Sequence, residues 1–169
     1  GGSGTISAGS GYAVGNNSNN TQYGVYTSNI TAAGGNIIVN GTGGTYASGT
    51  NYGVQTGSVS TTGTGTINIH GTGGTVGTNN WGIYASGVTN SSGSGAITLA
   101  GTGGTGASNY GVYVYSGSTI GYTNTNYTGA ITISADGAGF YESGGIIQTT
   151  NNSIDLSGIN TFYGSGDTI

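Results

Sequence analysis

Short apolar runs recur along the chain at intervals of about thirty residues, and each predicts a strand. In each run two apolar residues flank one residue, and five of the six flanked residues are polar. This period of two is typical of a strand with one buried side and one solvent-facing side. The apolar pairs are Ile6/Ala8, Ile37/Val39, Ile67/Ile69, Ile97/Leu99, Ile131/Ile133 and Ile154/Leu156, and the residues between them are Ser7, Ile38, Asn68, Thr98, Thr132 and Asp155.

A second set of runs follows the first and reads QYGVY, NYGVQ, NWGIY and NYGVY, with the shorter relatives GFY and TFY near the C-terminus. Alternation along these runs predicts one inward and one outward position in each. The inward residues are Val25, Val54, Ile83, Val112, Phe140 and Phe162, and the outward residues are Tyr26, Gln55, Tyr84, Tyr113, Tyr141 and Tyr163.

A third set contributes one apolar residue per repeat, at Ile30, Val59, Val88, Ile120 and Ile147, with turn-forming residues on both sides. Three short strands in each repeat of about thirty residues, without a helical period, predict an all-β parallel β-helix, or β-solenoid. We expect about six coils, with each strand pairing with its counterpart in the next coil.

The motif GTGGT occurs three times, at residues 41–45, 71–75 and 101–105. We expect its glycines to supply positive φ angles at a corner and to allow backbones to approach closely. Stacking every coil on its neighbour also predicts a ladder of amide hydrogen bonds through Asn51, Asn80 and Asn109.

The composition fits a stacked rod, because a charged residue repeated in every coil would repel its own copies. The chain has 169 residues, 40 Gly, no Lys or Arg, no Cys and only four acidic residues, for a net charge of −4. Without basic residues it has nothing to neutralise phosphate, so nucleic acid is not an expected partner. No apolar run is long enough to span a bilayer. An aggregation-prone low-complexity chain is the alternative that this composition leaves open.

We expect one segment, residues 1–169, with long GTGGT-bearing coils over 1–128 and shorter coils over 129–169. Two longer stretches, GYAVGNNSNNTQ and YSGSTIGYTNTNYT, are expected to form loops that bulge from one corner. Nothing in the sequence resembles a cap, so we expect the segment to continue in a longer chain or to stack into a fibre.

With the patterns GTINIHGTGGT and NYGVY in place, the chain from about Ile6 to Tyr163 resembles the Gly/Thr/Asn-rich repeat regions of filamentous-haemagglutinin-like exoproteins and autotransporter passenger regions. The resemblance implies a right-handed parallel β-helix, a bacterial extracellular or cell-surface location, and a role in adhesion or scaffolding.

Enzymatic chemistry is not expected. Asp136 and Asp155 fall near equivalent places on adjacent coils and could form a carboxylate pair, but solvated surface groups are the simpler interpretation. His70 has no partner residue for a metal site, and the coils lack the repeated Asp of calcium-binding repeats. No cofactor is expected.

The outward tyrosines are the candidate interaction face, because exposed aromatic patches are typical of contact surfaces. They are Tyr26, Tyr84, Tyr113, Tyr141 and Tyr163. The first hypothesis is a structural rod of an extracellular filament or stalk that stacks on itself. The second is an adhesin segment that binds glycan or another cell. Ice binding is disfavoured, because Thr42 and Thr45 would face opposite sides of a strand.

Overall fold

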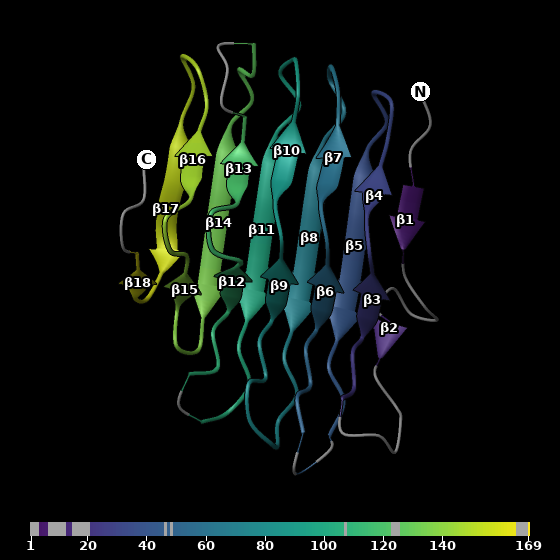
Figure 1. The fold of residues 1–169 in the computed structure, drawn as a ribbon, viewed down its shortest axis with the longest axis vertical. Helices are drawn as coiled ribbons and strands as arrows, with labels where there is room; N and C mark the ends of the chain where they lie inside the picture. The colour runs from purple at the N-terminus through teal and green to yellow at the C-terminus, as the bar shows by residue number, and fades with distance from the viewer. Residues whose placement is uncertain are drawn as a thin grey trace.

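The computed structural model describes residues 4–6, 13–14, 21–45, 47, 49–106, 108–122, 126–164 and 169. Within these residues the regular secondary structure is entirely β, in three parallel sheets whose strands lie side by side along the molecule (Figure 1). The sheets stack as a β-solenoid of about four turns. The predicted parallel β-solenoid is therefore confirmed, whereas the expected count of six coils is not.

The first sheet contains the longest strands. It consists of β1 (Gly4–Ile6), β2 (Ala13–Val14), β5 (Ile37–Thr42), β8 (Ile67–Thr72), β11 (Ile97–Thr102), β14 (Ile131–Asp136) and β17 (Ile154–Ile159). Between β5 and β8, and between β8 and β11, six residue pairs align without a shift. The register slips only between β14 and β17, next to Thr132.

The second sheet carries the aromatic runs. It consists of β3 (Val25–Thr27), β6 (Val54–Thr56), β9 (Ile83–Ala85), β12 (Val112–Val114), β15 (Phe140–Tyr141) and β18 (Phe162–Tyr163). The third sheet consists of β4 (Ile30–Thr31), β7 (Val59–Thr61), β10 (Val88–Asn90), β13 (Thr119–Gly121) and β16 (Ile146–Gln148). Four successive repeats, β5–β7, β8–β10, β11–β13 and β14–β16, thus contribute one strand to each sheet, and the last described repeat contributes only β17 and β18.

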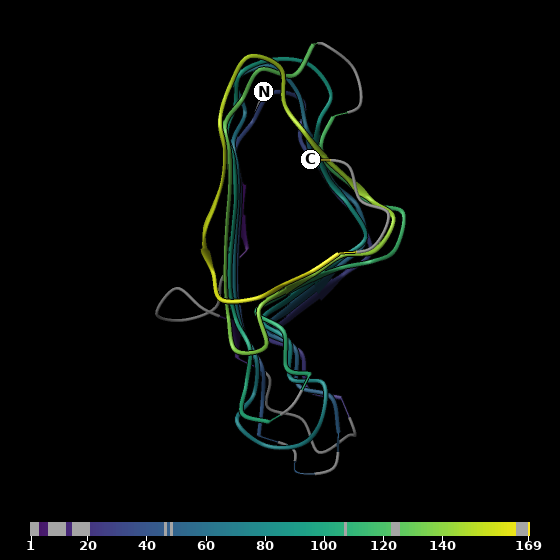
Figure 2. The ribbon, with the colours of Figure 1, turned by 90° about the vertical axis from the view of Figure 1, so that its left-hand side faces the viewer.

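Seen end on, the coils superimpose on a closed, roughly triangular outline with one long straight side (Figure 2). The first sheet forms that long side, and the loops between it and the second sheet project from one corner. Identical strands lie over one another because the same side chains recur at about 4.8 Å steps along the axis.

The interior is filled by the predicted inward residues. Val54, Ile83 and Val112 are fully buried and pair in register across β6, β9 and β12. In β5, β8, β11 and β14 of the first sheet the burial alternates, so that Ile67 and Ile69 are buried while Asn68 between them is only partly buried. The predicted inward residues Ile37, Val39, Ile97, Leu99, Ile131, Ile133, Val59, Val88, Ile120 and Ile147 are buried as well.

The last coil departs from this prediction. Phe162 is 39% exposed, whereas its register partner Phe140 is fully buried. Ile154 and Leu156 are likewise only partly buried. These residues do point toward the core, but no described coil covers their far side. Ser7 and Ala8 lie outside the described residues.

The glycines of GTGGT permit close backbone contact and do not supply positive φ. The described glycines with positive φ include Gly34, Gly63 and Gly93, which lie between the third and first sheets, but none from the three motifs. A Cβ on Gly71 would overlap with the backbone of Gly82, and Gly41 and Gly101 face Gly53 and Gly111 in the same way. The expectation of positive φ was therefore wrong for this motif, and the expectation of close approach is confirmed.

These contacts join the two repeated motifs. The first Gly of GTGGT lies against the Gly of the NYGVY-type run that follows it. The loop between the two motifs therefore begins and ends at one close backbone contact, where the first and second sheets meet. Side chains at either position would push the two sheets apart. GTGGT and NYGVY therefore recur together because each provides half of one contact.

The predicted asparagine ladder is present in a modified form. Nδ2 of Asn51 donates to Oδ1 of Asn80 at 2.9 Å, and the backbone N–H of Asn80 donates to Oδ1 of Asn109 at 2.8 Å. Asn51 also donates to the carbonyl of Val76 at 2.7 Å. All three side chains are buried, so the ladder supplies partners for polar groups that water does not reach, although Nδ2 of Asn80 has no hydrogen-bond partner among the described residues.

Of the two longer stretches, most of the first lies outside the described residues, and the second is not simply a bulging loop. Ala13–Val14 pairs with Gly41 and Thr42 of β5 as strand β2, and the rest of the first stretch, apart from Thr21 and Gln22, lies outside the described residues. The second stretch contains β13 and precedes β14. Tyr127 of this stretch is fully buried, so its side chain packs into the core and does not project outward.

Candidate functional site

Two columns of aromatic rings run along the outer surface of the second sheet. The outer column contains the predicted outward residues Tyr26, Tyr84, Tyr113, Tyr141 and Tyr163, with Gln55 in place of a ring in one coil. The inner column contains Tyr23, Tyr52, Trp81 and Tyr110, each directly before the Gly of its run. We call these nine rings the aromatic ladder.

The rings of the ladder pack against one another, both within and between coils. Trp81 and Tyr113 have ring centroids 4.2 Å apart and planes 2° apart. Tyr113 and Tyr141 are 4.6 Å and 7° apart, and Tyr52 and Trp81 are 4.8 Å and 9° apart. Because stacked neighbours lie on either side of Trp81 and of Tyr113, the faces of these two rings are occupied.

Tilted contacts connect the remaining rings. Tyr110 lies 5.2 Å from Tyr141 and packs edge-on against Tyr163 at 5.6 Å. At the other end, Tyr23 stacks on Tyr26 at 5.1 Å. The ladder is therefore continuous from β3 to β18, and its freest rings are at its ends: Tyr26 is 64% exposed and Tyr163 is 46% exposed.

Alternation along a strand did not reveal the inner column. A residue three positions before an outward Tyr should face inward if the strand were straight. The chain instead bends at Gly24, Gly53, Gly82 and Gly111, just before each strand begins. The bend turns the preceding aromatic ring to the same outer surface. The repeated order of aromatic, Gly, aliphatic and aromatic residues is the signal that could have found it.

Packing in the ladder changes the acid–base properties of its phenols. Burial raises the pKa of the Tyr113 hydroxyl, and the neighbouring phenols of Tyr141 and Tyr84 raise it further. The pKa values of Tyr52 and Tyr110 are raised, again mainly by burial. Outside the ladder, burial raises the pKa of Tyr127 to about 12. At neutral pH these groups are therefore hydrogen-bond donors without charge.

Stability should fall in alkaline solution for this reason. A folded-state pKa above the unfolded value near 10 means that the fold holds the phenol proton more tightly than the unfolded chain does. This stabilisation is complete below about pH 10 and is lost as the pH rises toward about 12, where the folded-state Tyr127 ionises. Circular dichroism and tyrosinate absorbance should therefore change together in this range.

The substitution Tyr127→Phe should flatten that pH dependence, because its ring stays in place without an ionisable hydroxyl. Tyr115→Phe is the matched control, since the Tyr115 ring is 55% exposed. Equal effects of the two substitutions on the alkaline transition would contradict the assignment.

Asp136 and Asp155 do not form the carboxylate pair that their sequence positions suggested. Asp136 pairs with Thr102, whereas Asp155 pairs with Thr132. The two carboxylates are thus offset by four positions along the strands, or about 13 Å, and not at equivalent places. Both are exposed. Hydrogen bonds from the hydroxyl and N–H of Ser157 lower the pKa of Asp155.

Glu142 behaves differently from the expected solvated acids, because it is fully buried. It follows Phe140, which points inward, and Tyr141, which points outward, so alternation turns its side chain inward. Its backbone N–H donates to the carbonyl of Tyr163 at 2.9 Å. The sequence did not predict a carboxyl group at this interior position. Asp167 lies outside the described residues.

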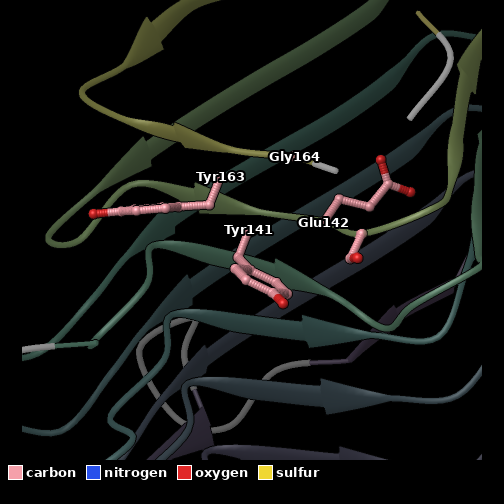
Figure 3. Close-up of a pocket in the computed structure, with 5 residues that line it drawn as sticks. Tyr141, Glu142, Tyr163 and Gly164 are labelled. Atoms are coloured by element: carbon pink, nitrogen blue, oxygen red, sulfur yellow. The ribbon is translucent and has the colours of Figure 1, made fainter. Parts of the chain in front are cut away.

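A cavity of about 230 Å³ lies at the β18 end of the aromatic ladder. It is lined by Tyr141, Glu142, Ser143, Tyr163 and Gly164. Figure 3 shows that the carboxylate of Glu142 points away from the rings of Tyr141 and Tyr163. The strand backbone separates these groups, so they do not converge on one ligand.

His70 occupies an outward, partly buried position of β8, between Asn40 and Ala100 of the neighbouring strands. Among the described residues no group of three or more His, Cys, Asp or Glu side chains is close enough to hold a metal ion. That part of the chain also contains no helix of the length and apolar character needed to cross a bilayer.

Comparisons with protein-family models, curated proteins and solved structures find no match to this chain. The functional argument therefore depends on the geometry of the solenoid and of its aromatic ladder.

Proposed function

We propose that this chain is a structural rod segment of an extracellular filament or cell-surface stalk, and that it assembles by stacking of coils. The continuous in-register pairing of three parallel sheets supports this proposal, because it builds a rod whose length depends only on the number of coils. Neighbouring coils contact one another through backbone hydrogen bonds, inward apolar side chains and the aromatic ladder, and the asparagine ladder adds to these contacts in three of the coils.

The observation that carries the proposal is the state of the last described coil. Phe162 is 39% exposed and Tyr163 is 46% exposed, and Ile154 and Leu156 lie partly open. One coil earlier, the register partners of Phe162 and Ile154 are Phe140 and Ile131, and both are fully buried. A further coil, from a continuation of the chain or from a second copy of it, would cover them and would pair with β16, β17 and β18, the last described strands of their sheets.

The proposal includes the finer features that the resemblance implies. These are a right-handed coil and a bacterial extracellular or cell-surface location; in addition, the six apolar runs of the sequence predict six coils in this segment. A right-handed crossover is the usual connection between parallel strands. The near absence of charge supports lateral and axial contact between like surfaces, because like charges do not face one another.

Electron microscopy of the purified chain over a range of concentrations tests the proposal. We expect long, uniform fibres that become longer as the concentration rises. The substitution Phe162→Asp places a charge on the exposed end of the coil and should leave single short rods. Thr72→Asp, on the outer side of β8, is the matched control and should form fibres as the unmodified chain does. Single rods of the unmodified chain at all concentrations would contradict the proposal, as would fibres of the Phe162→Asp chain.

A second candidate function is a glycan-binding adhesin segment, and the exposure of the end rings favours it. Sugar rings stack on free aromatic faces, and the covered faces of Trp81 and Tyr113 offer none. Tyr26 and Tyr163 are the candidate contacts. Retention of the chain on a glycan array, lost in the double substitution of these two residues by Ala and kept in Tyr122→Ala, would favour adhesion.

A further inference from the structure

The composition leaves this chain with only one common route to covalent cross-linking. It contains no Cys for disulfides and no Lys for amide or aldehyde-derived links. It also contains no Met, so the two side chains that oxidants usually consume first are both absent. The chain has 13 Tyr and one Trp. Oxidising equivalents that reach it therefore act mainly on aromatic rings.

The structure brings many of these rings into contact across coils. Tyr113 of β12 and Tyr141 of β15 pair in register and stack at 4.6 Å. Tyr84 of β9 lies 5.5 Å from Tyr113, and Tyr110 lies 5.2 Å from Tyr141. At such separations the ring carbons next to the hydroxyl groups of two tyrosines need only side-chain rotation to meet. No coil has to move along the axis.

We propose that the aromatic ladder is a site of oxidative tyrosine coupling, in which dityrosine bonds join neighbouring coils, with Tyr113 and Tyr141 as the principal pair. The closest stacked tyrosine pair of the ladder is this one. Both residues are partly exposed, so an oxidant can reach them from the solvent. The product is a covalent link between strands that only hydrogen bonds and packing otherwise hold.

The reaction needs a one-electron oxidant, such as a haem peroxidase supplied with hydrogen peroxide. Each of the two phenols gives up one electron and releases its hydroxyl proton to water. The two radicals form a carbon–carbon bond between their ortho carbons. The hydrogen on each coupled carbon then moves to the oxygen of its own ring, which restores both phenols. One peroxide accepts the two electrons and two protons and becomes two water molecules.

Trp81 connects this pair to the rest of the ladder. It stacks on Tyr113 at 4.2 Å and on Tyr52 at 4.8 Å. A radical formed on Trp81 can therefore take an electron from either tyrosine, which then loses its proton and becomes the radical. Oxidation that begins at Trp81 consequently reaches the Tyr113–Tyr141 pair without a diffusing intermediate.

Oxidation of the dilute, monomeric chain by peroxidase and hydrogen peroxide tests the proposal. We expect dityrosine fluorescence in material that remains a single chain, with an intact mass lower by two hydrogen atoms for each bond. Chymotryptic peptides analysed by mass spectrometry should include a Tyr113 peptide joined to a Tyr141 peptide. The test uses single chains, so it does not depend on fibre formation.

Tyr141→Phe should abolish that joined peptide while preserving the stacked ring, because phenylalanine has no phenol to oxidise. Tyr122→Phe, which alters a tyrosine outside the ladder, should leave its yield unchanged. Two results would overturn the proposal. One is cross-linking only between chains, and the other is an intramolecular yield that is insensitive to Tyr141→Phe or equal in a chain unfolded by urea.

Discussion

Replacing Gly71 with alanine will unfold the solenoid at moderate temperature. A Cβ at this position would lie 2.6 Å from the carbonyl carbon of Gly82 and 2.8 Å from Cγ1 of Ile83. The first of these atoms is backbone, so no side-chain rotation relieves the contact, and the first and second sheets must separate. We expect a loss of about 3 kcal/mol or more in the free energy of unfolding, at or above the usual cost of overpacking. Urea denaturation followed by circular dichroism measures it.

Gly117→Ala is the control for the loss of glycine itself. No atom lies within 4 Å of a Cβ built on Gly117, but its φ of +75° disfavours any other residue. The expected cost is about 1–2 kcal/mol, from backbone strain alone. If Gly71→Ala were as mild as Gly117→Ala, the contact between the two glycine motifs could not be close.

Replacing Leu99 with alanine should have the second large effect. Leu99 is fully buried in β11 and pairs with Ile69 on one side and Ile133 on the other. Truncation leaves a cavity that both neighbouring coils line, and we expect a loss of about 2–5 kcal/mol. Because a central coil supports both of its neighbours, the loss should also appear as faster amide hydrogen exchange in β8 and β14.

Thr98→Ala changes the preceding residue, which points outward and is only partly buried. Its expected effect is within about 0.5 kcal/mol, as for most surface substitutions. A comparable loss for Thr98 and Leu99 would mean that the inside and outside of β11 had been assigned wrongly.

The strands and their burial could be predicted from the sequence because they follow from local alternation. Ile67, Asn68 and Ile69 already show which side chains face the core, and the thirty-residue repeat predicts which strands pair. The handedness and the number of coils do not follow from this local pattern. The exposure of Phe162 could not be inferred either, because alternation shows only that its side chain faces the core and not whether another coil covers it.

Contacts between different parts of one coil were harder to predict. The close approach of Gly71 and Gly82 joins residues on two sheets, and nothing in the local pattern of either motif reveals it. The same is true of the inner aromatic column, because the bend at Gly82 reverses the side that Trp81 would otherwise face. The buried position of Glu142 was not predicted, although the alternation from the inward Phe140 places its side chain inside.

The outward tyrosines were predicted correctly in orientation but not in environment. Tyr113 was expected to present its ring to a partner, and its ring instead lies between Trp81 and Tyr141. This packing favours an internal role for the ladder, in which its rings hold neighbouring coils together. The proposed coupling chemistry would add covalent bonds between those coils.

The stacking of equivalent side chains along one axis is tested most directly by methyl nuclear Overhauser effects in solution. Val54, Ile83 and Val112 are far apart in the sequence but are register partners in β6, β9 and β12. We predict strong effects from Ile83 to both valines and none between Val54 and Val112, which are two coils or about 10 Å apart. Absence of the effects from Ile83, or evidence that these methyl groups are exposed to solvent, would contradict the solenoid.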